Sequence, residues 1–380
     1  MIISNKLKNS EEYIFSKLAK KVAQVEKTSG RKVLNLGIGS PTYPPSKNYL
    51  NKLKQFIDEP DSHLYPGYGA IPEFSESLIK WYKSRFLVSL DKDETYSLLG
   101  AKDGIVHLPL ALLNEGDEVL IPDPGYPAFS GPLLLFGIKP VFYNLTEDDN
   151  FKLNLVNIKN KVSTKTKIIW LNFPSNPTGQ VISKTEIEKL VAFCKQKKIL
   201  IVHDNVYSEI TFAGYKAPSI LQIKGAEDIA VEIGSFSKSF ALAGFRMAWI
   251  VGNKDAIKAL AKVKSQLDTG MSIPLQKLGA YALNNFDNKW HKKMISEYEK
   301  RRTIISARLK SLSLKYTLPT ASLYLWAKIP GKFDNSEEFC MKLLEERQIL
   351  LTPGSAFGKN GVRYIRASIS SDITDIAKYF

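Results

Sequence analysis

Lys238 lies in a segment whose composition suits a reactive amine. The segment Ser235–Arg246 is rich in serine and small residues, and two apolar runs that read as strands flank it, Ile229–Ile233 and Met247–Val251. A lysine that forms a Schiff base needs a lowered pKa and a partly dry site. Nearby hydroxyls and a guanidinium are groups that hold a cofactor phosphate. The alternative interpretation is a serine-rich loop with an ordinary solvated lysine.

Two further segments put a polar side chain directly after an expected strand. Asn176 follows the apolar run Lys167–Leu171 in a loop that two prolines and a glycine hold rigid. The apolar run Ile199–His203 is typical of a parallel-sheet strand, and it ends at Asp204, with Tyr207 close behind. Ligands gather at the carboxyl ends of such strands. A carboxylate there suits a pyridinium nitrogen, because it keeps that nitrogen protonated and lets the ring accept carbanion electrons.

The segment Gly100–Gly104 suits an anion site. It follows the expected strand Thr95–Leu99 and opens an expected helix at residues 102–113. Small residues at a helix N-terminus expose backbone N–H groups to a phosphate. Many strand-to-helix turns share this composition, so the segment indicates a phosphate only together with the other three.

In their order along the chain, these segments and Arg366 resemble the class I/II aminotransferases of the aspartate aminotransferase superfamily, which are fold-type-I pyridoxal phosphate (PLP) enzymes. The resemblance runs from about Leu34 to Ser370. It implies an α/β fold with a large domain (46–285) on a mostly parallel seven-stranded sheet, and a smaller α/β domain from both termini (1–45 and 286–380). Four stretches look most like LL-diaminopimelate aminotransferases and their relatives: Tyr65–Tyr68, Gly100–His107, Pro122–Pro127 and Gly214–Ile220.

The resemblance implies chemical roles for five residues. Lys238 would form a Schiff base with the cofactor and shuttle a proton during the transfer. Asp204 would pair with the pyridine nitrogen. Asn176 and Tyr207 would hydrogen-bond the phenolic oxygen of the cofactor, and Tyr126 would stack on its ring.

The same resemblance implies residues that hold the substrate and the phosphate. Arg366 would bind the substrate α-carboxylate as a bidentate fork, with Asn176 beside it and the backbone near Ile38 and Gly39 closing over it. Tyr65 would reach the phosphate of the neighbouring subunit, so we expect a homodimer with shared sites. The phosphate would be held within one subunit by Gly100, Ala101, Lys102, Ser235, Ser237 and Arg246.

The implied activity is transfer of the amino group of an α-amino acid, of the aspartate or LL-diaminopimelate type, to a 2-oxo acid such as 2-oxoglutarate. A PLP-dependent β-lyase that cleaves C–S bonds would share every residue named above and stays open as an alternative. A PLP-sensing regulator on this fold would carry an added DNA-binding domain. Only about 35 residues precede the first family-like segment, which disfavours the regulator.

Composition agrees with a two-domain enzyme. The chain has 380 residues, of which 44% are hydrophobic, so it can bury a full core. No apolar run approaches the ~20 residues of a membrane-spanning helix, and Met1–Lys6 lack the apolar core of a signal peptide. Cys194 falls on an apolar helical stripe and reads as a buried thiol, and with Cys340 it is one of two cysteines. These features favour a reducing cytoplasm.

The net charge of +15 favours encounter with anionic substrates over nucleic-acid binding. The lysines are dispersed, and no basic-aromatic motif accompanies them. Four histidines occur without metal-ligand spacing, so we expect no metal, and we interpret His203 as a core residue near the cofactor. On the long helix expected at about Asn288–Leu312, Arg301 and Arg302 are expected on a solvated face.

Overall fold

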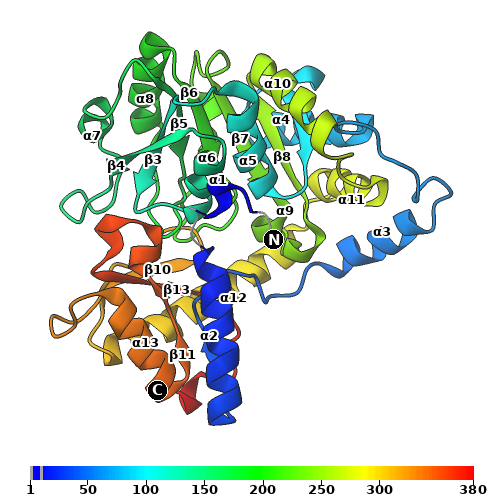
Figure 1. Cartoon of the computed structure of the whole chain (residues 1–380). Coiled ribbons are helices and arrows are strands. Elements are labelled where there is room, and N and C mark those ends of the chain that lie inside the picture. Colours follow the sequence, from blue (N-terminus) through cyan, green and yellow to red (C-terminus); the bar gives the residue numbers. More distant parts are fainter. Residues whose placement is uncertain (1–2, 9–11) are drawn as a thin grey trace.

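The computed structural model describes residues 3–8 and 12–380, and its largest element is a seven-stranded sheet (Figure 1). The strand order is β2-β8-β7-β6-β5-β3-β4, and β8 alone runs antiparallel to its neighbours β2 and β7. The mostly parallel sheet predicted from the sequence is therefore confirmed. Its strands are β2 (Thr95–Leu98), β3 (Glu118–Asp123), β4 (Lys139–Asn144), β5 (Thr166–Leu171), β6 (Leu200–Asp204), β7 (Ala230–Ser235) and β8 (Ala248–Gly252).

Both faces of the central strands of this sheet are covered, which explains why β5 and β6 are mostly apolar. Along β5, Trp170 packs into one buried cluster, whereas its neighbour Ile169 packs into another. Along β6, Val202 and Ile201 divide between the same two clusters. Because side chains alternate between the faces of a strand, the sheet is a middle layer between two cores. A polar side chain of a central strand can then reach a ligand most readily at the edge of the sheet where the strands end.

The helices lie on both sides of the sheet and in the smaller unit (Figure 1). A capping box begins α8, because Ser183 Oγ accepts from Glu186 N–H while the Glu186 carboxylate accepts from Ser183 N–H. Within the described residues, no helix has the length and apolar character to cross a bilayer. The helices are α1 (Asn5–Lys8), α2 (Ile14–Ser29), α3 (Lys47–Ile57), α4 (Pro72–Phe86), α5 (Ala101–Leu112), α6 (Gly131–Leu135), α7 (Leu155–Lys159), α8 (Lys184–Lys197), α9 (Phe236–Ser239), α10 (Lys254–Leu267), α11 (Ile273–Asn284), α12 (Asn288–Ser311) and α13 (Ser336–Arg347).

The two ends of the chain build a second unit together. Strand β1 (Leu34–Asn35) pairs in parallel with β11 (Ile349–Leu350), and Leu18 of α2 packs against Leu344 of α13. A four-stranded sheet has the order β12-β13-β10-β9. Helix α2 and strand β1 thus fold back onto the C-terminal unit, as the resemblance implied, whereas α1 contacts α6 of the large unit. Residues 1–2 and 9–11 of the expected small domain lie outside the described residues, and its bounds stay a prediction. The strands of this sheet are β9 (Lys315–Tyr316), β10 (Tyr324–Lys328), β12 (Thr352–Pro353) and β13 (Tyr364–Ser368).

The prediction that Arg301 lies on a solvated face is wrong. Its guanidinium is buried and donates to Thr42 Oγ1 at 2.7 Å and to the carbonyl oxygens of Ser370 and Ser371 at 3.0 and 2.9 Å. These acceptors come from segments far away in the sequence, so the local charge pattern of α12 could not reveal them. Arg301 instead joins the N-terminal and C-terminal segments.

Candidate active site

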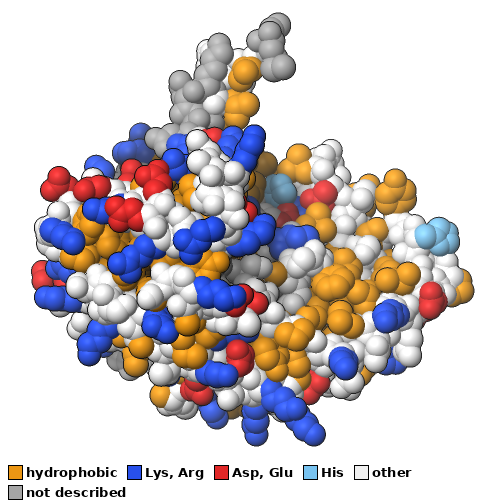
Figure 2. All heavy atoms as spheres, turned by 90° about the horizontal axis from the view of Figure 1, so that it is seen from below, with side chains coloured by type: hydrophobic (Ala, Val, Ile, Leu, Met, Phe, Trp, Pro, Cys, Tyr) orange, Lys and Arg blue, Asp and Glu red, His pale blue; other side chains and the backbone are white. Residues whose placement is uncertain are grey.

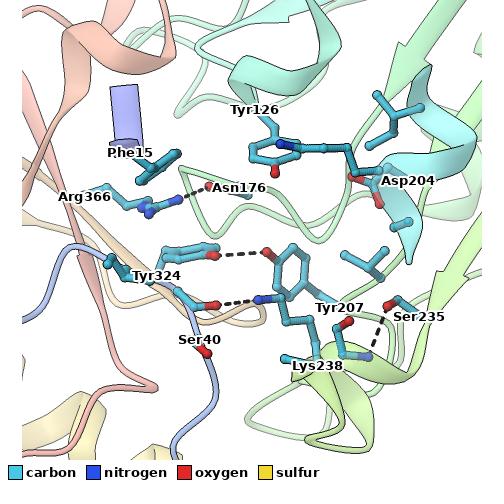
Figure 3. Close-up of a pocket in the computed structure, with 18 of the residues that line it drawn as sticks. Phe15, Ser40, Tyr126, Asn176, Asp204, Tyr207, Ser235, Lys238, Tyr324 and Arg366 are labelled. Atoms are coloured by element: carbon cyan, nitrogen blue, oxygen red, sulfur yellow. Dashed lines mark hydrogen bonds between the residues drawn. The ribbon is translucent and has the colours of Figure 1, made fainter. Parts of the chain in front are cut away.

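A cavity of about 430 Å³ lies where the carboxyl ends of the large sheet face the smaller unit (Figure 3). Apart from Gly100 and Tyr65, every site residue predicted from the sequence lines it. The predicted residues that line it are Ile38, Gly39, Ala101, Lys102, Tyr126, Asn176, Asp204, Tyr207, Ser235, Ser237, Lys238, Arg246 and Arg366.

Lys238 lies on the short helix α9, directly after β7. Ser235 begins this helix, because its Oγ accepts from Ser237 N–H at 3.1 Å. The Lys238 amine points across the cavity and donates to the carbonyl oxygen of Gly39 (Figure 3). Burial lowers the pKa of Lys238, and the positive charge of Arg366 adds to this effect. A lowered pKa enlarges the fraction of neutral, nucleophilic amine.

Asp204 ends β6 with one satisfied and one unsatisfied carboxylate oxygen. The side chain of Asn172 donates to Oδ2 at 3.2 Å and to the Asp204 carbonyl oxygen at 3.0 Å. Oδ1 is buried and has no hydrogen-bond partner among the described residues. Burial raises the pKa of Asp204 to about 7, against the lowering effects of His203, the Val206 N–H and Lys238. A buried, unpaired carboxylate oxygen is costly, so a ligand that presents a protonated nitrogen fits here.

Gly100 and Arg246 form a cradle at the start of α5. Gly100 has φ 84°, and a Cβ at this residue would lie 2.1 Å from Nη2 of Arg246. Glycine is therefore required for the close approach of backbone and guanidinium. The first N–H groups of α5, at Ala101 and Lys102, have no acceptor within the helix. Together with the guanidinium, they suit a phosphate.

Arg366 of β13 is buried at 2% exposure and held on two sides. Its Nη1 donates to Asn176 Oδ1 at 2.8 Å and its Nη2 to the Gly37 carbonyl oxygen at 2.6 Å. Its guanidinium carbon lies 4.2 Å from the ring centre of Tyr324 and 5.2 Å from that of Phe15. Stacking fixes the plane of the fork, and a carboxylate suits a guanidinium so held.

Two tyrosines that line the cavity were not predicted from the sequence. Tyr324 comes from β10, and its hydroxyl lies 3.1 Å from that of Tyr207 (Figure 3). Burial alone would raise the pKa of Tyr324, but the charges of Arg366 and Lys238 lower it, whereas burial raises the pKa of Tyr207. Tyr13 also lines the cavity, with its hydroxyl 3.3 Å from that of Tyr126. No local pattern marks these tyrosines, because tertiary packing alone brings them to the site.

Two predicted site residues lie outside the cavity lining. Gly100 lies directly behind the guanidinium of Arg246, which lines the cavity. Tyr65 is 85% exposed, on a loop away from the cavity of its own chain. His203 is fully buried, as expected for a core residue.

A cluster of acids near the cradle holds a lysine. The ammonium of Lys264 lies 2.6 Å from Asp103 and 2.7 Å from Asp268. These acids and His107 have the spacing of metal ligands, but the Lys264 ammonium already pairs with both carboxylates. Asp103 also accepts from Leu99 N–H at 2.8 Å, so the cluster braces the turn before α5.

Comparison with known proteins agrees with this geometry. The sequence profile of the family "Aminotransferase class I and II" matches residues 31–377. LL-diaminopimelate aminotransferases from Halothermothrix orenii and Aquifex aeolicus are 36% and 38% identical over 97% of this chain and 94% of their own lengths. The apo structure of BacF from Bacillus subtilis superposes with a TM-score of 0.95 at 30% identity, covering 100% of this chain and 96% of that one.

The family profile spans both units of the chain. The two LL-diaminopimelate aminotransferases match this chain almost from end to end. The profile and these relatives agree with the fold-type-I architecture predicted from the sequence. The chain therefore belongs to the class I and II aminotransferases, enzymes that transfer an amino group.

Proposed function

We propose that this aminotransferase uses PLP and moves the α-amino group of an amino acid of the LL-diaminopimelate or aspartate type to a 2-oxo acid such as 2-oxoglutarate. Members of the family generally use PLP. The single observation that carries the proposal is the buried Oδ1 of Asp204, which lacks a partner among the described residues and belongs to a side chain that lines the same cavity as the Lys238 amine. A pyridinium nitrogen is the donor that would satisfy it. LL-diaminopimelate is the donor in the names of the relatives, and the aspartate type follows from the likeness to the aspartate aminotransferase superfamily.

Each part of the cofactor has a matching group in the chain. Asp204 would hold the ring nitrogen, and Asn176 and Tyr207 the phenolic oxygen. Tyr126 would cover one face of the ring. The cradle of Gly100, Ala101, Lys102, Ser235, Ser237 and Arg246 would hold the phosphate, with Tyr65 of a partner subunit reaching the same group.

Different residues of the chain would then have different roles in the amino transfer. When bound, PLP supplies an aldehyde that condenses with amines and a ring that accepts electrons. Lys238 would hold that aldehyde while no substrate is bound, and its amine, once free, would accept and carry the proton that leaves the substrate Cα. Arg366 and the backbone at Ile38 and Gly39 would fix the α-carboxylate, so that the Cα proton faces Lys238. Asp204 would stay negatively charged while electron density moves toward it.

Arg366→Lys is expected to impair amino transfer with every donor and acceptor. The variant keeps the charge but loses the planar fork and its stacking on Tyr324. Because all substrates share the α-carboxylate, kcat/KM should fall by a similar factor of about ten to a hundred for each. Steady-state kinetics with several amino acids and oxo acids measures this. A loss confined to one side-chain class would make Arg366 a side-chain selector instead.

We also propose a homodimer in which each site uses residues of both chains. The loop with Tyr65 supports this, because Tyr65 and Tyr68 are 85% and 66% exposed while Leu64 beside them is 50% exposed. Neighbouring exposed aromatic and apolar side chains are typical of surfaces that meet a partner.

Mixed dimers test this arrangement. Lys238→Ala and Tyr65→Ala subunits are unfolded, mixed and refolded, and each variant refolded alone is the control. If sites are shared, one site of a mixed dimer carries both lesions and the other carries neither, so activity should rise above both controls. If each site came from one chain, every site would keep a lesion and no rise would appear.

A cytoplasmic location completes the proposal. Cys194 and Cys340 are both unpaired and buried. Burial raises the pKa of the Cys194 thiol to about 12, so it would stay a neutral, unreactive thiol. Free structural thiols suit a reducing compartment.

A donor screen tests the proposed reaction. The PLP-loaded protein is given 2-oxoglutarate with LL-diaminopimelate, aspartate, methionine or an aromatic amino acid, and glutamate is measured. The proposal expects glutamate with LL-diaminopimelate or aspartate as the best donor. Pyruvate and ammonia released from a sulfur amino acid without an oxo acid would instead identify a C–S β-lyase.

A further inference from the structure

A loop of the C-terminal unit, residues 354–361, lies against the end of β3 in the large sheet. Both carboxylate oxygens of Asp123, the last residue of β3, accept from backbone N–H groups of this loop. Oδ1 accepts from Asn360 at 3.0 Å and Oδ2 from Lys359 at 3.1 Å. The Asn360 side chain donates to the Asp123 carbonyl oxygen at 3.0 Å and to Oδ1 of Asn144, at the end of β4, at 3.2 Å. We call these four hydrogen bonds the β3 clasp.

The loop approaches the carboxylate so closely that a glycine is required. Gly358 has φ 134°, and a Cβ at this residue would lie 2.1 Å from Oδ1 of Asp123. A larger residue would therefore push the loop away from β3. Asp123 is 5% exposed, so its oxygens depend on the N–H groups of the loop. Because a backbone N–H group can only donate, the direction of both hydrogen bonds to the carboxylate is fixed.

Phe357 of the same loop contacts groups of both units beside the cavity. Its carbonyl oxygen accepts from the N–H of Gly125 at 2.8 Å, and Gly125 directly precedes Tyr126. The centre of its ring lies 4.7 Å from the guanidinium carbon of Arg366. Tyr126 and Arg366 line the same cavity from the two units (Figure 3). The β3 clasp therefore holds a residue that contacts both Arg366 and the segment that carries Tyr126.

We propose that Asp123 is a positioning residue for substrate binding. By holding the 354–361 loop against β3, it keeps the ring of Phe357 against Arg366 and so helps to fix the guanidinium plane across the cavity from Tyr126. Arg366 can then meet a carboxylate without first having to be ordered. The β3 clasp does not depend on the proposed function, whereas its benefit to substrate binding rests on the role of Arg366 in that function.

Hydrogen exchange of the full chain without substrate tests the β3 clasp. Asp123→Asn keeps the size of the side chain but offers one acceptor oxygen in place of two, so one N–H group of the loop loses its partner. The peptide that covers residues 354–361 should exchange roughly three- to tenfold faster in this variant, which corresponds to one net hydrogen bond. A peptide from β10 should keep its exchange rate. Unchanged exchange of the loop peptide would show that the carboxylate does not hold the loop.

Steady-state kinetics of the PLP-loaded protein test the positioning role. In Asp123→Asn, part of the substrate-binding free energy is used to bring the loop back into place. KM should therefore rise roughly three- to tenfold for every amino acid and oxo acid. Lys238 and Asp204 are unchanged, so kcat should fall by less than about twofold. A fall in kcat with an unmoved KM would overturn the proposal.

Asn360→Ala weakens the β3 clasp from the other side and replaces Asp123→Asn if that variant does not fold. It removes the side-chain hydrogen bonds to Asp123 and Asn144 but leaves both bonds to the carboxylate. KM should rise in the same direction, by a smaller factor. Ser355→Ala is the matched control, because it removes a hydrogen bond from the same loop to Glu337 of α13, within the C-terminal unit. Its KM should equal that of the unmodified protein.

The outcomes separate this proposal from the proposed function. An unmoved KM in Asp123→Asn and Asn360→Ala, or an equal rise in Ser355→Ala, would show that the β3 clasp does not position Arg366. An unmodified protein that transfers no amino group would instead contradict the proposed function. The exchange measurement would then still decide whether Asp123 holds the loop.

Discussion

Replacing Lys238 by alanine is expected to abolish amino transfer and the absorbance of a lysine-linked cofactor. In the proposed function this side chain supplies both the amine that holds the aldehyde and the base that moves the Cα proton. Loss of a general acid–base group alone lowers rates by about 10²- to 10⁴-fold, and loss of the cofactor linkage adds to this decrease in kcat. PLP should still bind through the cradle at Gly100 and Arg246, because the substitution leaves that part of the cavity unchanged.

Spectral titration of the variant with PLP, beside an activity assay, measures both effects. Lys102→Ala is the matched control, because Lys102 is a second lysine that lines the same cavity. This control should keep the lysine-linked absorbance. A normal lysine-linked spectrum in Lys238→Ala would show that another amine holds the cofactor.

Asp204→Ala should leave Lys238 able to hold the cofactor but should slow proton removal strongly. A neutral pyridine is a poor electron acceptor, and loss of one charged hydrogen bond in a buried site is worth roughly 2–4 kcal/mol, or two to three decades in rate. The decrease should appear in kcat, measured with saturating donor and 2-oxoglutarate.

Asp204→Asn separates charge from shape. The amide can still accept the hydrogen bond that Asn172 donates to Oδ2, so the loop at residues 172–176 should stay in place. If charge is the decisive property, the asparagine variant should be nearly as slow as the alanine variant. Near-normal kcat in either variant would refute the role of Asp204.

The sequence was sufficient to predict the large sheet and the side chains at its edge. Apolar runs gave the strands to within about two residues, as with Ile199–His203 for β6. A residue that directly follows such a run is placed by its own strand, so Asp204 and Lys238 could be expected at one edge. Their place in the motif order then linked them to Arg366, which no local pattern singles out.

The sequence could not predict contacts that depend on how distant segments pack. Tyr324 begins an ordinary strand, and nothing nearby in the sequence marks its hydroxyl as a partner of Tyr207. Asn172 could not be predicted for the same reason, because its side chain contacts Asp204 on the neighbouring strand β6. Arg301 shows the converse error, because a charged helix face was read as solvated although distant carbonyl groups bury its guanidinium.

The surface charge indicates a general preference for anionic ligands but does not mark a particular binding site. On the face shown in Figure 2, lysine and arginine side chains are scattered among polar and apolar ones. On this face the positive charge is therefore not gathered in one patch, and the net charge of +15 would act as a diffuse field on anionic amino and oxo acids. Salt should weaken that field, since exposed charges are screened over a Debye length of about 8 Å at physiological ionic strength.

The central claim is that Lys238 is the amine that holds the cofactor. Its most direct test is reduction of the PLP-loaded protein with borohydride, which makes the lysine linkage permanent, followed by mass analysis of the peptides. One modified peptide is expected, and it should carry the added pyridoxyl phosphate group on Lys238. Modification of Lys102 or another lysine in place of Lys238, or no modification at all, would contradict it.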